Sequence, residues 1–208
     1  MGSTLSSLIK DTAIYGLSSM FGRFLNWLLT FVYVKVMIPE EFGMMTNLYA
    51  WTAILMIILT YGMETTFFRY ANKHDRPEDV YTTTLYALGG SSLLFTLVAL
   101  AFLSPLTEAL HVSGQSNLLV CLVLIIASDA FMAIPLGYLR YEQRPWRFFG
   151  IRMSFVLVTI VLTLFSFYVL PWLSKTMPST FGGFHPREQA LDYIFGINLV
   201  SNAIQLIL

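Results

Sequence analysis

The chain has 208 residues, of which 56% are hydrophobic and only 12% are charged. Soluble domains usually carry about 25% charged residues, so this chain has too little polar surface to cover a water-soluble globule. Its mean hydropathy of +0.68 predicts an integral membrane protein. Twelve cationic and twelve anionic side chains cancel, which gives no indication of nucleic-acid binding.

Six stretches are apolar over the ~20 residues that a helix needs to cross a bilayer core of about 30 Å. In chain order they are Thr12–Val36, Gly43–Tyr70, Thr82–Leu103, Asn117–Leu139, Phe148–Leu173 and a sixth from Leu191. They are continuously apolar, whereas the strands of a membrane β-barrel alternate between apolar and polar residues. Irregular backbone exposed to lipid is also excluded, because its amides would have no hydrogen-bond partner. The prediction is therefore an all-α, polytopic membrane helix bundle. The sixth stretch is still apolar at Leu208, which predicts that residues 1–208 form one six-helix lobe of a longer protein.

The cations between these stretches and near their ends predict the orientation. Eight fall on one side of the membrane under this assignment: Lys10, Arg69, Lys73, Arg76, Arg140, Arg144, Arg147 and Arg152. Three fall on the other side: Lys35, Lys175 and Arg187. Because cytoplasmic loops carry the excess of Lys and Arg, the N-terminus and both Arg-rich loops are predicted to be cytoplasmic.

The first apolar stretch carries a polar stripe with a cation near its centre. Tyr15, Ser19, Arg23, Asn26 and Thr30 recur at spacings of three and four, which places them on one helical face. A guanidinium is always charged and can donate two parallel hydrogen bonds to phosphate oxygens. The stripe therefore predicts a hydrated cavity in which Arg23 binds an anionic group of a substrate. The structural alternative, an internal ion pair of Arg23 with a carboxylate, remains open.

Two acidic residues also lie within the apolar stretches, where an ionised side chain costs roughly 2.5–3.5 kcal/mol to insert at mid-bilayer. Glu64 is expected to pair with Arg69 or with an arginine of the other cytoplasmic loop, and Asp129 either pairs internally or couples transport to an ion. Pro135 is expected to kink the fourth stretch. The small residues 89–92 predict close helix packing.

The remaining reactive residue types form no recognisable site. Cys121 is the only cysteine, and the three histidines fall in three different predicted loops. These positions predict no disulfide, no metal site and no cofactor. The sequence also contains no phosphate-binding glycine loop, no His-Glu-x-x-His and no Gly-x-Ser-x-Gly, so we expect a protein that is not an enzyme.

Several segments together carry a resemblance to a known family. They are Asp11–Gly16, Pro39–Gly43, Tyr61–Ala71, Asp129–Pro135 and Leu139–Arg144. In order and spacing the chain resembles the polysaccharide-biosynthesis, or oligosaccharide flippase, family of the multidrug/oligosaccharidyl-lipid/polysaccharide exporter superfamily. The resemblance implies the N-terminal lobe of a bacterial inner-membrane transporter with two six-helix lobes around a central cavity. It also implies that Arg23 contacts the pyrophosphate of a lipid-linked substrate.

The expected function is the flipping of a lipid-pyrophosphate-linked oligosaccharide across the cytoplasmic membrane for surface polysaccharide biosynthesis. The expected partners are that lipid, the surrounding membrane lipids and a C-terminal lobe. Arg69, Arg140 and Arg144 are expected either to recruit the head-group or to act only as topology determinants. Two alternatives stay open: an ion-coupled multidrug exporter that uses Asp129 or Glu64, and a non-transporting membrane scaffold.

Overall fold

The computed structural model describes residues 2–110, 112, 115–176 and 189–208, and for residues 2–15, 17–19 and 175 it describes the backbone alone. Within these ranges the chain is helical and contains no strand, as predicted. The elements are α1 (Gly2–Val36), α2 (Pro39–Thr60), α3 (Met63–Ala71), α4 (Pro77–Ala101), α5 (Leu103–Ala109), α6 (Ser116–Tyr141), α7 (Pro145–Leu164), η1 (Phe165–Val169), α8 (Leu170–Thr176) and α10 (Ala190–Ile207).

Three of the long helices begin at a proline: α2 at Pro39, α4 at Pro77 and α7 at Pro145. Proline suits this position because its fixed φ is helical and its missing N–H has no intrahelical partner there. In α2 the acidic side chains of Glu40 and Glu41 follow in the first turn, where they interact favourably with the positive end of the helix dipole. The helix starts are therefore encoded locally.

Five segments are long and apolar enough to cross a membrane: Pro39–Ala71, Pro77–Ala101, Ser116–Tyr141, Pro145–Ser174 and Ala190–Ile207. They coincide with the second to sixth predicted stretches, and the chain is a multi-pass membrane protein. The first predicted stretch lies within α1, which is helical over its whole length. Its membrane crossing stays a prediction.

The second predicted stretch is not one straight helix. It divides into α2 and α3 at Tyr61 and Gly62, which both have positive φ, at 32° and 70°. Glycine adopts this left-handed conformation at little cost, whereas tyrosine does not. The threonines beside the break, Thr60 and Thr66, donate hydrogen bonds to the carbonyls of Met56 and Gly62. The prediction of one continuous stretch over Gly43–Tyr70 did not include this break.

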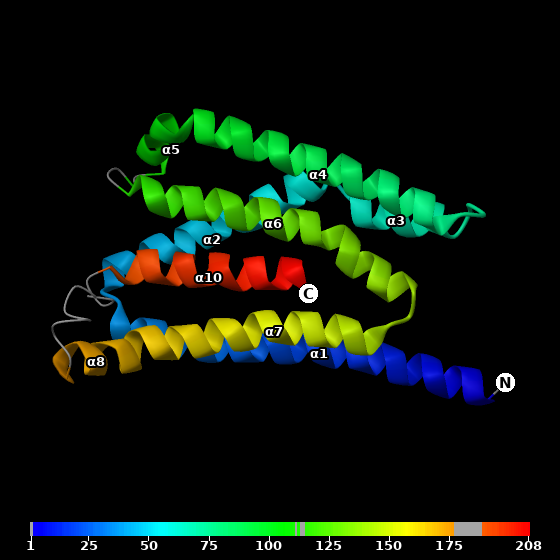
Figure 1. The fold of residues 1–208 in the computed structure, drawn as a ribbon, viewed down its shortest axis with the longest axis horizontal. Coiled ribbons are helices and arrows are strands. Elements are labelled where there is room, and N and C mark those ends of the chain that lie inside the picture. The colour runs from blue at the N-terminus through cyan, green and yellow to red at the C-terminus, as the bar shows by residue number, and fades with distance from the viewer. Residues whose placement is uncertain (1, 111, 113–114, 177–188) are drawn as a thin grey trace.

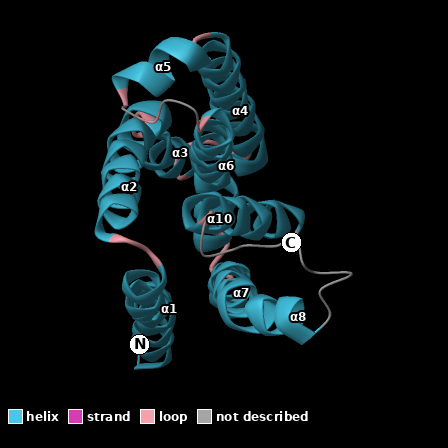
Figure 2. Cartoon of the chain, turned by 90° about the vertical axis from the view of Figure 1, so that its left-hand side faces the viewer, coloured by secondary structure: helices cyan, strands magenta, loops and turns pink. Residues whose placement is uncertain are grey.

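The helices pack in a continuous series. Helix α4 lies against α6, α6 against α10, α10 against α7, and α7 against α1, while α2 lies against α6 (Figure 2). Helix α6 contains Pro135 and bends in its C-terminal half (Figure 1), as expected from the proline. The N-terminus and the α3–α4 and α6–α7 turns lie at the same end of the bundle (Figure 1). This placement agrees with the predicted alternation of the loops.

Close packing joins α4 and α6. A Cβ atom at Gly89 would lie 3.3 Å from Cε2 of Phe131, which is tighter than most real contacts, so the small residue permits the approach predicted for this patch. Nearer the α3–α4 turn, Phe67 is fully buried, with Leu88 and Ile134 in the same cluster. The rings of Tyr81, Tyr138 and Tyr141 surround Phe67 at centroid distances of 6.4, 6.1 and 5.8 Å.

Candidate functional site

Three adjoining cavities lie among the membrane-spanning helices. The arginine cavity, of about 200 Å³, is lined by Gly22, Arg23, Asn26, Arg152, Met153, Phe155 and Val156. The amide cavity, of about 410 Å³, is lined by Asn26, Leu29, Thr30, Tyr33, Phe42, Met45, Thr46, Tyr49, Thr52, Ile125, Asp129, Phe155, Thr159, Asn198 and Asn202.

The ion-pair cavity, of about 460 Å³, is lined by Met56, Thr60, Gly62, Met63, Glu64, Thr65, Asp129, Met132, Ala133, Leu136, Arg140, Arg152, Phe155 and Gln205. Phe155 lines all three cavities, and the other shared residues connect them in pairs. Asn26 joins the arginine and amide cavities, Arg152 joins the arginine and ion-pair cavities, and Asp129 joins the amide and ion-pair cavities. The three cavities therefore adjoin one another between α1, α2, α3, α6, α7 and α10.

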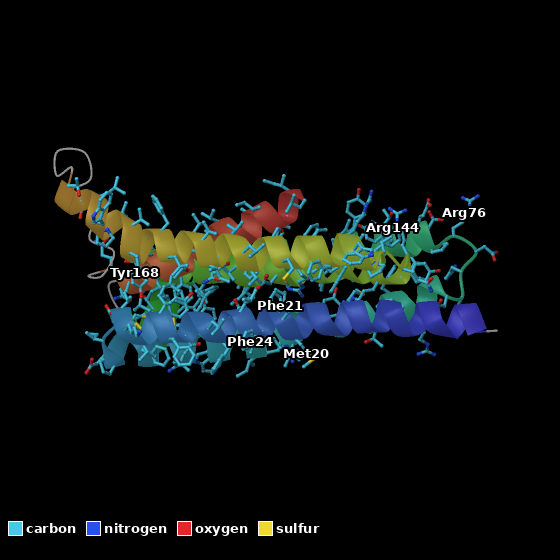
Figure 3. All side chains as sticks on the ribbon, turned by 90° about the horizontal axis from the view of Figure 1, so that it is seen from below. Met20, Phe21, Phe24, Arg76, Arg144 and Tyr168 are labelled. Atoms are coloured by element: carbon cyan, nitrogen blue, oxygen red, sulfur yellow. The ribbon has the colours of Figure 1, made fainter. Side chains whose placement is uncertain are left out.

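Arg23 lines the arginine cavity between α1 and α7, and it forms no ion pair with a carboxylate in the described part of the chain. Both polar residues that follow it on the predicted stripe, Asn26 and Thr30, line the amide cavity. The opposite face of α1 carries exposed aromatic side chains, including Phe21 and Phe24 (Figure 3). The helix thus has one face towards the cavities and another suited to lipid. The predictions for Tyr15 and Ser19 concern side chains outside those described.

Arg152 is the second cation of the arginine cavity, and its position corrects a prediction. Arg152 was predicted to be a loop cation, but α7 begins at Pro145, so Arg152 lies two turns inside the helix. Polar residues recur along the same face of α7 at Thr159 and Thr163. This helical spacing of seven and four was the signal that could have identified Arg152 as a cavity residue.

Asp129 lies opposite Arg152, not opposite Arg23. The electrostatic neighbours of the Asp129 carboxyl include the Arg152 guanidinium, and the Arg152 guanidinium in turn has Arg140 and Glu64 nearby. The amide of Asn202 also approaches the carboxyl, at a geometry that falls short of a hydrogen bond. Among the described cations Arg152 of α7 is thus an electrostatic neighbour of Asp129, although the two side chains are not close enough to form an ion pair.

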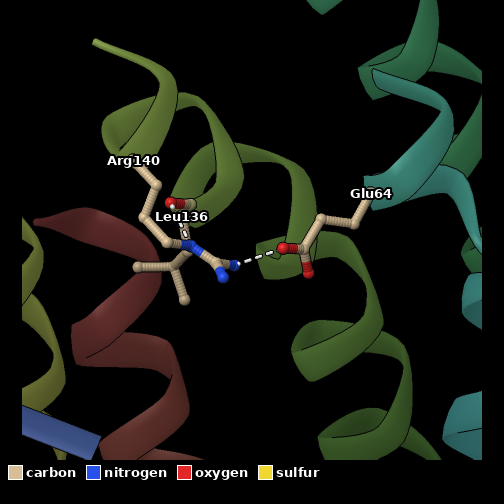
Figure 4. A network of polar contacts seen from close by, with 3 residues as sticks. All are labelled: Glu64, Leu136 and Arg140. Carbon is tan, nitrogen blue, oxygen red and sulfur yellow. Dashed lines mark hydrogen bonds and ion pairs between the residues drawn. The ribbon is translucent and has the colours of Figure 1, made fainter. Parts of the chain in front are cut away.

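Glu64 pairs with Arg140 across α3 and α6 (Figure 4). Arg140 Nη2 lies 2.7 Å from Glu64 Oε1, and the Arg140 Nε–H donates to the Leu136 carbonyl at 3.4 Å. The guanidinium also lies over the Phe148 ring, 5.5 Å from its centroid. This geometry confirms the expected pairing of Glu64 with an arginine of the other Arg-rich loop.

The Glu64–Arg140 ion pair is expected to hold α3 against α6 beyond the break in α2–α3. We expect Arg140→Glu to lower the free energy of unfolding by about 1 kcal/mol, because both side chains are only half-buried and exposed ion pairs contribute 1 kcal/mol or less. The double variant Glu64→Arg/Arg140→Glu is expected to recover most of that loss in thermal unfolding of the purified protein. A double variant no more stable than Arg140→Glu would contradict the pairing.

The other cations expected to recruit a head-group lie at the end of the bundle near the N-terminus. Arg69 is exposed on the last turn of α3. Arg144 lies at the α6–α7 turn (Figure 3), where its Nε–H is 3.0 Å from Glu142 Oε2. Both Arg140 and Arg144 thus already have a carboxylate partner, so a recruiting role for them would require these ion pairs to open.

The family model described as polysaccharide biosynthesis protein matches residues 8–182. This range includes the break at Tyr61 and Gly62 and both cations of the arginine cavity. The chain belongs to the polysaccharide biosynthesis protein family. The comparison with curated proteins and the comparison with solved structures gave no match. As a member of this family, the chain is a membrane protein of polysaccharide biosynthesis and export.

In the ranges that the structure describes, no three or more His, Cys, Asp or Glu side chains come together as metal ligands. His74 lies beside the Tyr70 ring at the α3–α4 turn, with a centroid distance of 6.3 Å. The other two histidines, His111 and His185, lie outside the described residues. The chemistry that the cavity residues offer is binding by charge and hydrogen bonds.

Proposed function

We propose that the chain is part of a transporter that flips a lipid-pyrophosphate-linked oligosaccharide across the cytoplasmic membrane. The observation that supports this proposal is the arginine cavity, where Arg23 and Arg152 line one space between membrane helices. Guanidinium groups keep their charge and bind phosphate oxygens in a bidentate manner. Arginines at membrane depth are costly and usually face a cavity or a partner. A pyrophosphate in this cavity would be such a partner.

The arrangement of the cavities supports transport rather than catalysis. The anionic group would occupy the arginine cavity while the lipid tail stays in the bilayer beside the apolar face of α1. The family resemblance implies that these helices form one of two lobes. Alternating access would then rock this lobe against the other around a fixed binding site.

Charge placement supports an orientation with the N-terminus in the cytoplasm of a bacterial cell. Arg76 and Arg144 lie towards the N-terminal end of the bundle, whereas Tyr168 lies at the other end (Figure 3). Cations concentrate on the cytoplasmic side of membrane proteins. We therefore infer that a substrate enters the cavities from the inner leaflet of the inner membrane.

The ion-coupled multidrug exporter is the weaker candidate. Cationic drugs would need an acidic cavity, and Asp129 is the acidic residue of the amide cavity. Glu64 is paired with Arg140, and Arg152 is an electrostatic neighbour of Asp129. With Arg23 added, the lining of the three cavities together carries more cations than anions, which favours anions.

The experiment that tests the proposal is complementation by the full-length protein in cells that lack it. We expect Arg23→Ala to lower the surface polysaccharide at least tenfold, because the pyrophosphate loses a charge-assisted partner, and Arg23→Lys to retain part of the activity. Phe24→Ala, on the exposed face of the same helix turn, is the matched control and is expected to behave as wild type. Wild-type polysaccharide in cells with Arg23→Ala, at equal protein level, would refute the role of Arg23.

A further inference from the structure

The amide cavity contains a different chemistry from the arginine cavity that it adjoins. Its polar residues are mainly neutral donors and acceptors rather than cations, and they come from α1, α2, α6, α7 and α10. Its volume of about 410 Å³ lies within the range of small-molecule sites, roughly 300–1,000 Å³. The identity of its occupant rests on the proposed function, in which the substrate carries sugars next to its pyrophosphate.

Asn202 of α10 is the side chain that most needs a ligand here. It is 1% exposed, its amide approaches the Asp129 carboxyl, and neither its amide nitrogen nor its amide oxygen makes a hydrogen bond of good geometry within the described residues. Buried polar groups are nearly always hydrogen-bonded, and an unpaired one calls for an explanation such as a missing ligand or water. Because Asn202 lines the cavity, a bound molecule could satisfy its two donors and its acceptor.

One turn before Asn202 on α10, a second amide is held in place beside an aromatic ring. Asn198 Nδ2 donates to Tyr49 Oη at 2.8 Å and to the Ile194 carbonyl at 2.9 Å, and its amide oxygen is an acceptor that these bonds do not use. Tyr49 is fixed in turn by stacking on Phe195, with centroids 5.2 Å apart and planes 15° apart. The cavity wall therefore combines oriented amides with a rigid aromatic ring.

Threonine hydroxyls of α2 and α7 also line the amide cavity. Thr52 of α2 and Thr159 of α7 are buried, and each donates to the carbonyl four residues earlier, at 2.9 and 2.8 Å. Their donors are thus used within the helix, while their oxygen lone pairs remain free to accept. The cavity offers donors from Asn202 and acceptors from Thr52, Thr159 and Asn198.

We propose that the amide cavity is the subsite for the sugar residue attached to the pyrophosphate of the substrate. A pyranose ring carries several hydroxyls, each a donor and an acceptor, and an apolar C–H face that can lie on an aromatic ring. These properties match the mixed donors and acceptors of the cavity and the ring of Tyr49. Asn26 lines both cavities, so a sugar here is directly next to a phosphate between Arg23 and Arg152.

A coupling cation fits this cavity less well than a sugar does. The acidic side chain that the described residues contribute to its lining is Asp129, which has the guanidinium of Arg152 as an electrostatic neighbour. A cation needs a few ligands at close range, whereas this space holds about 410 Å³ and has apolar walls at Leu29, Met45 and Ile125. The size and the neutral lining favour an uncharged, polyhydroxylated group.

The test compares two lipids on the purified full-length protein: undecaprenyl pyrophosphate, and the same lipid carrying one N-acetylhexosamine. We expect the wild type to bind the sugar-bearing lipid at least tenfold more tightly. Asn202→Leu, which keeps the size of the side chain and removes its hydrogen-bonding groups, is expected to reduce that preference to near unity. Its affinity for bare undecaprenyl pyrophosphate is expected to stay unchanged.

Ser201→Ala is the matched control, because Ser201 is the neighbouring buried residue of α10 and its hydroxyl donates to the Ile197 carbonyl. It does not line the cavity and is expected to keep the wild-type preference. Tyr49→Phe removes only a hydroxyl and is expected to lower the preference partially. This milder variant tests the subsite independently should Asn202→Leu fail to fold.

Three outcomes would overturn the sugar subsite: no preference of the wild type for the sugar-bearing lipid, an unchanged preference in Asn202→Leu and Tyr49→Phe, or an equal loss of affinity for both lipids in them. A loss of Na⁺-dependent transport with the lipid preference intact would assign the amides to a cation instead. Failure of the proposed function has a different signature. In that case the wild type binds neither lipid, and Arg23→Ala changes nothing.

Discussion

Replacing Arg152 by alanine is expected to lower transport by about 10- to 100-fold. Charge-assisted hydrogen bonds contribute about 1.5–3 kcal/mol each, and Arg152 supplies one of the two guanidinium groups of the arginine cavity. The same substitution leaves Asp129 without its cationic neighbour. We therefore also expect the free energy of unfolding to fall, on the order of 2 kcal/mol for an uncompensated acid at membrane depth.

These two effects can be separated with a second substitution. Asp129→Asn combined with Arg152→Ala removes the uncompensated charge, so the double variant is expected to regain stability but not transport. Arg147→Ala is the matched control, since Arg147 lies on the first turns of α7 and lines none of the three adjoining cavities. Transport that recovers together with stability in the double variant would show that Arg152 acts only as a structural counter-ion.

The largest loss of stability is expected for Phe67→Ala, at about 3 kcal/mol. Phe67 is fully buried between α3, α4 and α6 and contacts three tyrosine rings. Truncating a buried phenylalanine typically costs about 3–5 kcal/mol in soluble proteins. The lower end applies here, because lipid is as apolar as the protein interior and only packing is lost. Thermal unfolding in detergent measures the effect.

The control for this prediction is the same substitution at a phenylalanine that is exposed rather than buried. Phe102→Ala removes a ring that is 59% exposed at the α4–α5 junction, so the change in unfolding temperature is expected to be small. If Phe67→Ala were as stable as Phe102→Ala, the buried aromatic cluster would not be what holds α3 in place. Because α3 carries Glu64, the Phe67 variant is also expected to weaken the Glu64–Arg140 contact.

The sequence determined the fold class and the helix positions. A bilayer has no water to satisfy backbone amides, so continuous apolar stretches of the right length can only be helices. The predicted stretch Asn117–Leu139 became α6 at Ser116–Tyr141, and Phe148–Leu173 lies inside the spanning segment Pro145–Ser174. The periodic stripe of α1 also predicted that Arg23 and Asn26 share a cavity, since a single helix fixes which of its residues share a face.

The tertiary structure decided which helix faces meet, and therefore the identity of the partners. Arg152 was counted with the loop cations although the predicted stretch from Phe148 already contained it, because the sequence does not show that its side chain faces a cavity. Asn198, Asn202 and Gln205 recur at spacings of four and three, a polar stripe like that of α1 that the sequence analysis did not use, and only the packing shows which cavities these amides line. The break at Tyr61 and Gly62 was not predicted, because an isolated glycine such as Gly62 is tolerated inside a helical pattern and does not by itself indicate a break. The spacing of polar residues along one helix specifies which of them share a face of that helix. Which faces of different helices contact each other depends on the packing of the whole bundle.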